Sequence, residues 1–384
     1  MTKKMKNSVL VVLLVLCIRG NSQTRFAGRI ESKNGRQSIE NVNVIVQHTG
    51  YATTTNKEGR FELSIDQTNN PIPILVSCIG YESQLIYIAP NLDLTIYLKE
   101  STIPLDEIKV ISKIHLLKKA LANYEDNYCS TCQYDFFLKQ VSVFDNEITK
   151  YTEFLGLLSK IKNKSYRMKT YKISKSINSV FLLNKIDDSK FVLKNFFDQL
   201  DVFYVLNLLI DNSDLFETEI DYNSFDKTTI YKLSFIQKSI PNKIIMMIES
   251  ENYAVVSIDL IAARGVGIDK ELKVNEQYTK RAVASSGSVH FRKHDDKWIL
   301  NDLEGVLEIA YQSKNDGLIN NRNSFRLYTT KFYDKLINKT SGSFDLSKDI
   351  LDQNKNVESA DIIENVISKT EKEKLFFDKN KSTN

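Results

Sequence analysis

The stretch T-T-T-N-K-E-G-R-F-E-L-S-I, from Thr53 to Ile65, indicates how the first part of this chain folds. A run of threonines leads into the polar turn N-K-E-G, and the chain then alternates apolar residues with polar ones. Alternation at a period of two is typical of a strand with one buried face, and a glycine that closes the turn supplies the backbone freedom of a tight hairpin. The segment predicts a β-hairpin, and it holds no residue set for catalysis.

Short strands of the same character continue on both sides of this hairpin. Turn sequences separate them, among them K-N-G at 33–35, H-T-G at 48–50 and N-N-P at 69–71. The predicted strands are Arg25–Glu31, Asn43–Gln47, Ala52–Thr55, Gly59–Ile65, Ile72–Ile79, Ser83–Ile88 and Asp93–Leu98. Short strands at such regular spacing are typical of a Greek-key-like β-sandwich.

The order of motifs over residues 23–111 resembles one domain family. G-R-I-E is followed by V-N-V-I-V, T-T-T-N-K-E-G-R-F, S-C-I-G-Y, I-Y-L-K and L-D-E-I-K-V-I. This order is similar to the carboxypeptidase regulatory-like domain, a transthyretin-like β-sandwich common in secreted and outer-membrane proteins of Bacteroidetes. The residues that carry the resemblance are Gly28, Gly50, Asn56, Gly59, Phe61, Gly80, Tyr81 and Leu105.

The resemblance implies structural roles for these residues and no peptidase activity, because the domain is an accessory module in carboxypeptidases. The family usually has Asp where Asn56 stands, and either residue keeps a polar turn. The segment that starts at Leu105 often joins this module to the plug and barrel of a TonB-dependent receptor. The chain that follows here is too short for that barrel, so the sequence does not favour a transporter.

The first 22 residues have the pattern of a secretory signal peptide. Three lysines precede an apolar run over 9–18, and G-N-S at 20–22 supplies small residues for cleavage after Ser22. The run is too short for a permanent membrane helix. We therefore expect export across the inner membrane, to the periplasm or the periphery of the outer membrane, and no integral membrane protein. Lipidation at Cys17 remains an alternative, although Leu16 is not the small residue that a lipoprotein signal places there.

The charge balance gives no support to a nucleic-acid partner. The chain has 52 basic and 48 acidic residues. Removal of the signal peptide takes away four basic residues and no acidic one, so the expected mature chain has a formal charge of zero.

Residues 112–340 predict a second, antiparallel α+β domain. Apolar residues at helical spacing predict helices over Ile111–Asn127 and Phe191–Ile210. Strands are predicted over Tyr134–Val143, Ile148–Leu157, Thr228–Ile236, Asn242–Leu260 (a hairpin), Leu272–Lys280, Ser288–His294, Trp298–Leu300, Gly305–Gln312 and Ser324–Phe332. Residues 341–384 form a charged tail with a predicted helix around Val357–Leu375.

The order of helices followed by a curved sheet resembles periplasmic half-barrel proteins that carry lipoproteins or lipids. The resemblance rests on the 242–260 hairpin and on the order of elements. It implies an apolar groove for an acyl chain or a peptide. The other interpretation is that the helices fill the concave face and nothing binds there.

Three cysteines remain after the expected cleavage. Cys129 and Cys132 form a C-x-x-C pair, which in an oxidising compartment predicts a local disulfide. A redox role is the alternative, but that motif gains its reactivity at a helix N-terminus in a βαβ context. Here it follows a predicted helix and precedes a strand. Cys78 lies in an apolar run and predicts a buried thiol.

The sequence has no ligand set for a catalytic metal. None of the four histidines, His48, His115, His290 and His294, is followed by Glu in an H-x-x-E pattern. Residues four apart in a strand are separated by about 13 Å, so the last two do not share an ion and are expected at the surface.

No nucleophile or nucleotide motif is complete either. S-G-S at 286–288 is not a nucleophile elbow, and G-V-G at 265–267 lacks the third glycine of a nucleotide loop. The acid pairs at 187–188 and 295–296 predict solvated turns. Trp298 predicts a core anchor, with a surface sugar platform as the alternative.

These patterns predict a mostly β, non-enzymatic protein of the cell envelope that needs no cofactor. The leading hypothesis is a binding or assembly module at the periplasmic side of the outer membrane, with envelope proteins or a lipid or peptide ligand as partners. The alternative is a periplasmic carrier of lipid or lipoprotein. A peptidase or other hydrolase is the least favoured.

Overall fold

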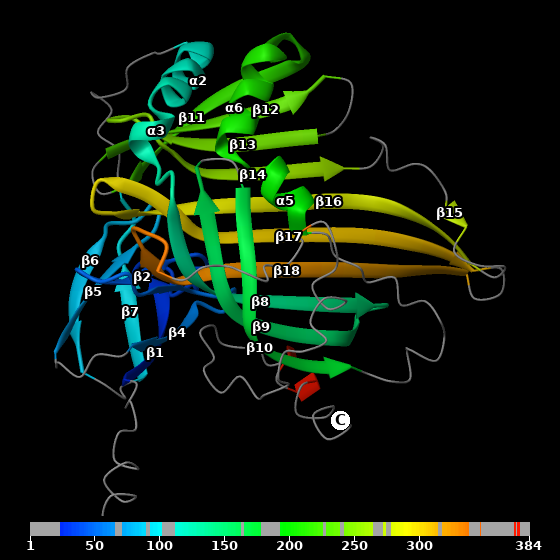
Figure 1. Cartoon of the computed structure of the whole chain (residues 1–384), viewed down its shortest axis with the longest axis horizontal. Helices are drawn as coiled ribbons and strands as arrows, with labels where there is room; N and C mark the ends of the chain where they lie inside the picture. Colours follow the sequence, from blue (N-terminus) through cyan, green and yellow to red (C-terminus); the bar gives the residue numbers. More distant parts are fainter. Residues whose placement is uncertain are drawn as a thin grey trace, which may run out of the picture.

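The computed structural model of the chain is mostly β, as the sequence predicts: a sandwich of two small sheets adjoins one large curved sheet (Figure 1). The structure describes residues 24–65, 71–89, 93–101, 112–162, 165–177, 193–225, 228–238, 242–263, 272–273, 278–313, 317–337, 346, 372–373 and 375–376. The predicted signal peptide, the Leu105 motif and most of the predicted tail helix lie outside these residues.

All seven predicted strands of the sandwich are present. They are β1 (Thr24–Ser32), β2 (Asn43–Val46), β3 (Ala52–Thr54), β4 (Arg60–Ile65), β5 (Ile72–Ser77), β6 (Gln84–Ile88) and β7 (Asp93–Leu98). One sheet has the order β4-β1-β7 and the other β3-β2-β5-β6. Phe61, Leu63 and Ile65 alternate into a core shared by both sheets, as their period of two predicts.

The second domain begins with helices α2 (Lys113–Ala122) and α3 (Tyr124–Asn127), and its large sheet follows. Three strands, β8 (Cys132–Phe144), β9 (Glu147–Ile161) and β10 (Ser165–Ile177), precede helices α5 (Leu193–Gln199) and α6 (Val202–Asp211) and a 3-10 turn, η2 (Ser213–Leu215). The remaining strands are β11 (Phe216–Phe225), β12 (Thr228–Gln237), β13 (Asn242–Glu249), β14 (Val255–Ala263), β15 (Leu272–Lys273), β16 (Tyr278–His294), β17 (Lys297–Ser313) and β18 (Gly317–Tyr333).

The sheet joins these strands in the order β10-β9-β8-β18-β17-β16-β14-β13-β12-β11, with β15 beside β16. Its main-path neighbours are antiparallel, and β8 pairs with β18, so the first and last strands of the domain lie side by side. This pairing brings Gln133 next to Tyr333. The three-stranded unit β8–β10 is thereby joined to the long meander β11–β18.

Two predicted helices are each divided in the structure. The segment Ile111–Asn127 forms α2 and α3, and Phe191–Ile210 forms α5 and α6. The second break lies at Asp201, whose extended backbone stops α5 and whose side chain accepts a hydrogen bond from the Tyr204 amide at 2.9 Å. A carboxylate in this position caps the first turn of the next helix. Apolar spacing continues across such a cap, which is why periodicity alone predicted one helix.

The strand predictions for the large sheet were correct in position but too short in places. Of the predicted strand Leu272–Lys280, the first two residues form β15, the last three begin β16, and residues 274–277 lie outside the described part. Ser288–His294 belongs to β16, and Trp298–Leu300 and Gly305–Gln312 are parts of β17. Strand β10 was not predicted from the sequence.

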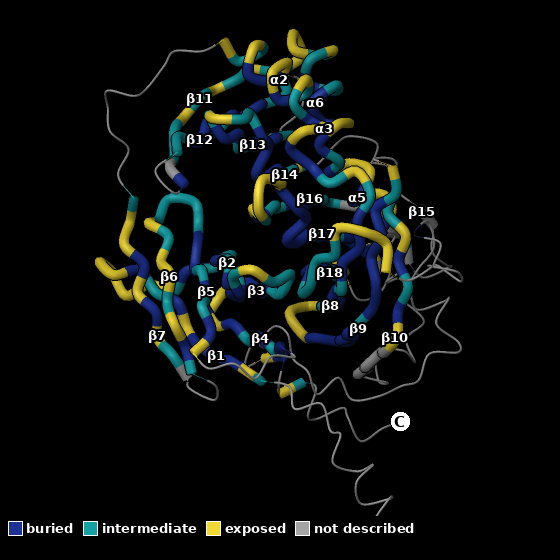
Figure 2. Tube along the Cα trace, turned by 60° about the vertical axis from the view of Figure 1, so that its left-hand side comes forward, coloured by how far each residue is buried: buried dark blue, intermediate teal, exposed yellow. Residues whose placement is uncertain are grey.

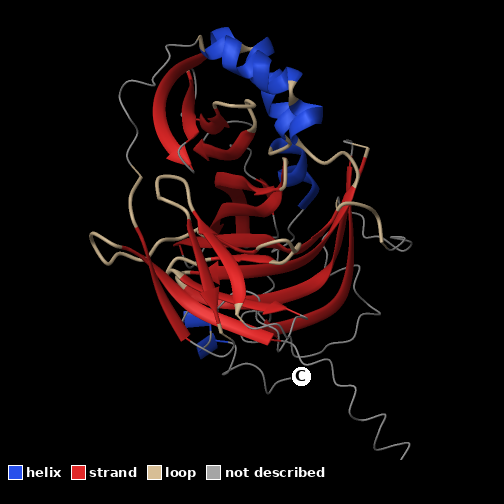
Figure 3. Cartoon of the chain, turned by 90° about the vertical axis from the view of Figure 1, so that its left-hand side faces the viewer, coloured by secondary structure: helices blue, strands red, loops and turns tan. Residues whose placement is uncertain are grey.

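The helices pack on the inner face of the large sheet, as Figure 3 shows for the curved sheet and the helices along it. Phe196 of α5 lies over Gly305, and its ring meets that of Phe325 edge-on with centroids 5.0 Å apart. A Cβ at Gly305 would lie 2.6 Å from the Phe196 ring. The glycine therefore leaves the space that α5 occupies, and the helices fill this part of the concave face.

The sandwich lies against the opposite, outer face of the large sheet, next to β18 (Figure 2). Strand β3 makes this contact, and all three of its residues are buried, which breaks the alternation seen in β4. The threonine run that opens the quoted hairpin is buried as well. The two domains keep separate apolar cores, one in the sandwich and one between the sheet and its helices.

Candidate functional site

The hairpin that carries the family motif is organised by one side chain. The Asn56 Oδ1 atom accepts hydrogen bonds from the backbone amides of Glu58 at 3.0 Å and Arg60 at 2.9 Å. Gly59 has φ +71°, the left-handed region that glycine adopts without strain. Phe61 then enters the sandwich core with 1% of its surface exposed. Asn56 thus acts as a local turn former.

The other motif residues also lie in the framework of the sandwich. A Cβ at Gly28 would lie 2.5 Å from the Leu94 carbonyl oxygen, so this glycine permits close contact between β1 and β7. Gly80 has φ +87° and precedes Tyr81, which forms an isolated bridge with Glu100.

Gly50 has a different position, because it lies at the contact between the two domains. Its carbonyl oxygen accepts a hydrogen bond from the Phe332 amide at 3.1 Å. A Cβ at this position would lie 2.3 Å from the Phe332 carbonyl oxygen, which is far inside van der Waals contact. Nearby, the Lys331 ammonium donates to the Tyr51 hydroxyl at 2.8 Å. The loop that follows β2 therefore docks directly onto the backbone of β18.

A buried arginine completes this junction. The Arg326 guanidinium is 3.2 Å from a Glu40 carboxylate oxygen of the sandwich, and it also donates to the Asn41 side chain. On its own sheet it lies 3.4 Å from Asp302 and 3.6 Å from Glu304. One cation from β18 thus pairs with carboxylates from both domains.

The charges at the junction hold each other ionised. Burial opposes ionisation of Asp302, but His290 and Arg326 outweigh it and lower the pKa of the carboxyl to about 2. Burial likewise disfavours the charged form of His290, yet the carboxylates of Asp302 and Asp259 raise its pKa above the ordinary value. The His290 Nδ1 atom lies 3.1 Å from Asp302.

The prediction of exposed surface positions for the last two histidines was therefore wrong for both His294 and His290. His290 belongs to the charged network of the outer face and is half-buried. His294 is also half-buried, and its ring meets that of Phe332. Trp298 is 2% exposed and lies in the core, as predicted.

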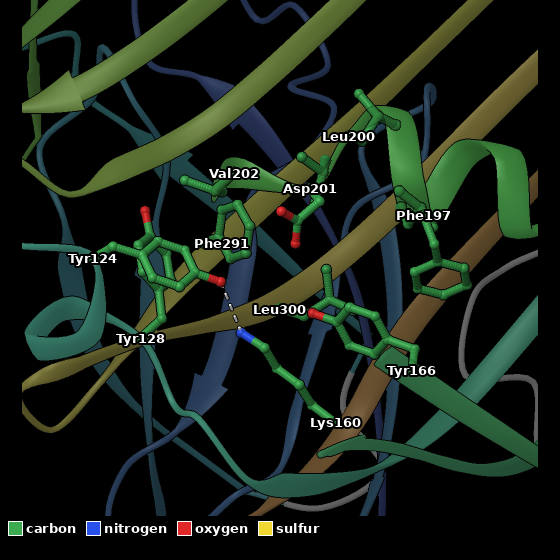
Figure 4. Close-up of a pocket in the computed structure, with 12 residues that line it drawn as sticks. Tyr124, Tyr128, Lys160, Tyr166, Phe197, Leu200, Asp201, Val202, Phe291 and Leu300 are labelled. Carbon is green, nitrogen blue, oxygen red and sulfur yellow. Dashed lines mark hydrogen bonds between the residues drawn. The ribbon is translucent and has the colours of Figure 1, made fainter. Parts of the chain in front are cut away.

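A small cavity lies on the inner face, between α3, the α5–α6 junction and the sheet (Figure 4). Its volume is about 20 Å³, enough for about one water molecule. Ligand pockets for small molecules are usually at least about 300 Å³. This cavity is therefore too small for an acyl chain, and it gives the carrier hypothesis no support.

Polar groups nevertheless converge in this cavity among aromatic rings. Figure 4 shows the Lys160 side chain reaching Tyr124, whose hydroxyl accepts a hydrogen bond from Nζ at 3.3 Å. Burial lowers the pKa of Lys160 and raises that of Asp201. Each favours the charged form of the other, but the cost of burial is the larger effect on both. Sequence reasoning missed this pair because the two residues come from β9 and from the cap of α6.

The predicted disulfide between Cys129 and Cys132 is not formed in the structure. Both residues are thiols, and their side chains are hydrogen-bonded to each other. Cys132 is fully buried, and its sulfur lies 3.3 Å from the Tyr134 hydroxyl oxygen, within hydrogen-bond distance. Cys78 is half-buried against the sandwich core, and burial raises the pKa of its thiol to about 12.

The outer edge of the sandwich is exposed and apolar. Strand β6 is the last strand of its sheet, opposite to β3, so it lies farthest from the contact with β18. Leu85 is 44% exposed and Tyr87 is 66% exposed. Both point away from the core, next to Leu75 and Pro73 of β5. The strand sequence Q-L-I-Y-I has no charge, proline or glycine.

The described part of the chain contains neither a clustered metal site nor a membrane-spanning helix. Within those residues, no group of three or more His, Cys, Asp or Glu side chains is placed to hold a metal ion. The described helices include none that is both long enough and apolar enough to cross a membrane.

Comparison with known proteins identifies the sandwich but not the large sheet. Residues 26–110 match the sequence model of the CarboxypepD_reg-like domain, a noncatalytic regulatory domain. No curated protein matches the chain. Among solved structures, the chain matches a protein of unknown function from Bacteroides fragilis, with 9% identity, 81% of this chain and 98% of that chain covered, and a TM-score of 0.17. A likeness this low supports no argument about fold or function.

Proposed function

We propose that this protein is a non-enzymatic binding module of the cell envelope that holds an extended segment of another envelope protein along strand β6. The observation that carries the proposal is that, among the described strands, β6 pairs only with β5, so that its other edge lies unpaired beside the exposed residues Leu85 and Tyr87. Natural proteins usually protect such edges with lysine, proline or a bulge. An extended partner strand would pair with the free backbone and cover the apolar side chains.

The rest of the architecture supports a scaffold role for the large sheet. Arg326 and Gly50 fix the sandwich on the outer face of that sheet, at the edge opposite to β6. The partner edge is therefore presented away from the junction. Export and a position at the periplasmic side of the outer membrane are part of the proposal, supported by the sequence pattern of residues 1–22.

Site-specific photo-crosslinking tests the proposal. A photo-reactive phenylalanine replaces Tyr87 in the full chain, and the matched control carries it at Tyr204 on α6, which is 52% exposed. Envelope preparations are irradiated and the crosslinked peptides are sequenced. We expect a crosslink from position 87 to one strand-like segment of an envelope protein, and no such product from position 204.

A second experiment places a charge on the exposed edge of β6. With the photo-reactive residue kept at position 87, Leu85→Lys should abolish the crosslink, because burying the ammonium against a partner strand is costly. Leu318→Lys, at the exposed start of β18, should leave it unchanged. Equal products from both photo-reactive positions, a crosslink that survives Leu85→Lys, or a product linking only two copies of this chain would overturn the proposal.

A further inference from the structure

Two thiols that the proposed function does not use lie together where the helices meet the sheet. Cys129 follows α3 in a short loop, and Cys132 is the first residue of β8. Their side chains are hydrogen-bonded, and Cys132 is fully buried whereas Cys129 is half-buried. Because the two side chains are hydrogen-bonded to each other and only two residues separate them in the chain, a bond between them requires no rearrangement of the two domains.

A buried cation lies next to this pair. Lys160 is the direct cross-strand partner of Cys132 in the pairing of β8 with β9. Side chains of directly opposite residues in an antiparallel pair start about 5 Å apart. Lys160 is only 7% exposed, and its ammonium is hydrogen-bonded to the Tyr124 hydroxyl. The electrostatic field of Lys160 therefore acts on both sulfur atoms in surroundings with little water.

The groups around the pair favour a thiolate on Cys129 and a proton on Cys132. The hydrogen bond from Cys132 is the main reason why the pKa of Cys129 falls to about 7, and Lys160 and Lys297 lower it further, against the effect of burial. The same hydrogen bond and burial raise the pKa of Cys132. The other titratable groups that surround the pair and Lys160 are Tyr124, Tyr134, Tyr166 and Asp201.

We propose that Cys129 and Cys132 form a redox-active dithiol that exchanges with a disulfide of low molecular weight. Cys129 is the attacking thiolate because it is the accessible member, and Cys132 is the resolving thiol. Since Cys129 is itself half-buried, a small disulfide reaches the sulfur more readily than a folded protein does.

The exchange balances in two steps. The Cys129 thiolate attacks one sulfur of the external disulfide, which forms a mixed disulfide and releases the first thiolate. Cys132 then loses its proton and attacks the Cys129 sulfur, which releases the second thiolate and leaves the Cys129–Cys132 disulfide. The pair gives up two electrons and the external disulfide is reduced to two thiolates. The Cys132 proton ends on one of them, and the other takes up from solvent the proton that Cys129 lost when it became a thiolate.

A titration in glutathione buffers tests the reversibility of the pair. The purified chain is equilibrated at increasing ratios of reduced to oxidised glutathione, quenched with acid and alkylated, and the peptide spanning 129–132 is weighed. We expect a reversible change between dithiol and disulfide within the range of these buffers. A pair that stays fully oxidised is a structural disulfide, and one that stays fully reduced is inert. Either result overturns the proposal.

Trapping separates the roles of the two thiols. In Cys132→Ser, oxidised glutathione should accumulate as a mixed disulfide on Cys129, whereas in Cys129→Ser it should not accumulate on Cys132. Cys78 is the internal control and should carry no glutathione, because it lies against the sandwich core with a high pKa. Equal labelling of Cys129 and Cys78 would contradict the assignment.

The contribution of Lys160 is measured by alkylation of Cys129 against pH in the reduced protein. Lys160→Met keeps the length of the side chain and removes its charge. We expect a higher midpoint and an alkylation rate at pH 7 that is lower by about twofold or more. The matched control is Lys162→Met, an exposed lysine two residues away, which should leave the profile unchanged. If the two variants showed the same pH dependence of Cys129 alkylation, Lys160 would not contribute to the reactivity of Cys129.

Discussion

Replacing Arg326 by methionine should weaken the whole protein far more than the same change on a neighbouring residue. The methionine has a similar length but no charge, so it leaves Glu40, Asp302 and Glu304 without their shared cation. Asp302 is fully buried, and its nearest oxygen lies 3.4 Å from the guanidinium. Removing one partner of a buried ion pair costs about 3–5 kcal/mol, and that is the loss in free energy of unfolding that we expect.

The control variant is Arg322→Met, four residues earlier on β18. Arg322 is 54% exposed and lies 3.9 Å from Glu308, so it forms a surface ion pair. Such pairs contribute about 0–1 kcal/mol. The two variants therefore remove the same chemical group from the same strand, and they differ in burial and in contact with the sandwich.

Urea unfolding followed by the fluorescence of Trp298 measures both losses, since Trp298 is the single tryptophan and is buried in the core of the large sheet. The double variant Arg326→Met with Glu40→Gln should lose less than the sum of the two single losses, because the pair couples the domains. The reasoning is refuted if Arg326→Met costs no more than Arg322→Met, or if the two losses at Arg326 and Glu40 simply add.

Three further outcomes follow from the same structure. Gly50→Ala should open the junction, because its Cβ would lie 2.3 Å from the Phe332 carbonyl oxygen. Trypsin should therefore cleave this folded variant faster than the control Gly35→Ala, whose added Cβ meets no atom closer than 3.6 Å. Asn56→Ala should destabilise the protein by about 1–3 kcal/mol in calorimetry, since two backbone amides lose their acceptor, and Asn56→Asp should cost less because it keeps an oxygen there. The raised pKa of His290 means that its protonated form stabilises the fold fully below the unfolded pKa, and that this contribution is lost as the pH rises through the folded pKa. The difference in unfolding free energy between the native chain and His290→Gln should thus shrink with rising pH, and a difference that stays constant with pH would contradict this reasoning.

The sandwich was predictable because its signals are local. Each strand alternates at a period of two, and residues such as Asn56 and Gly59 close a turn with partners only a few positions away. The same locality located the β8–β9 hairpin, whose turn at 145–146 lies between the predicted strands Tyr134–Val143 and Ile148–Leu157.

The junction and the thiol site were not predictable in the same way. Arg326 meets Glu40 across 286 positions of sequence, and nothing in the pattern of β18 distinguishes this arginine from Arg322. Lys160 and Asp201 likewise come together only when the α5–α6 segment covers the inner face of the sheet. Charges on strands are expected to face solvent, and only the tertiary structure identifies the ones that are buried.

The pairing of β8 with β18 has a consequence for the order of folding. The large sheet becomes continuous only when Gln133 of β8 pairs with Tyr333 of β18, which lies two hundred residues later in the chain. Contacts this distant carry a large loop-closure cost and form slowly. Until then, both strands present open edges that can pair with other chains. A protein that crosses a membrane as an unfolded chain, N-terminus first, would present β8 long before β18 arrives, so we expect its yield to depend on chaperones that shield this edge during the delay.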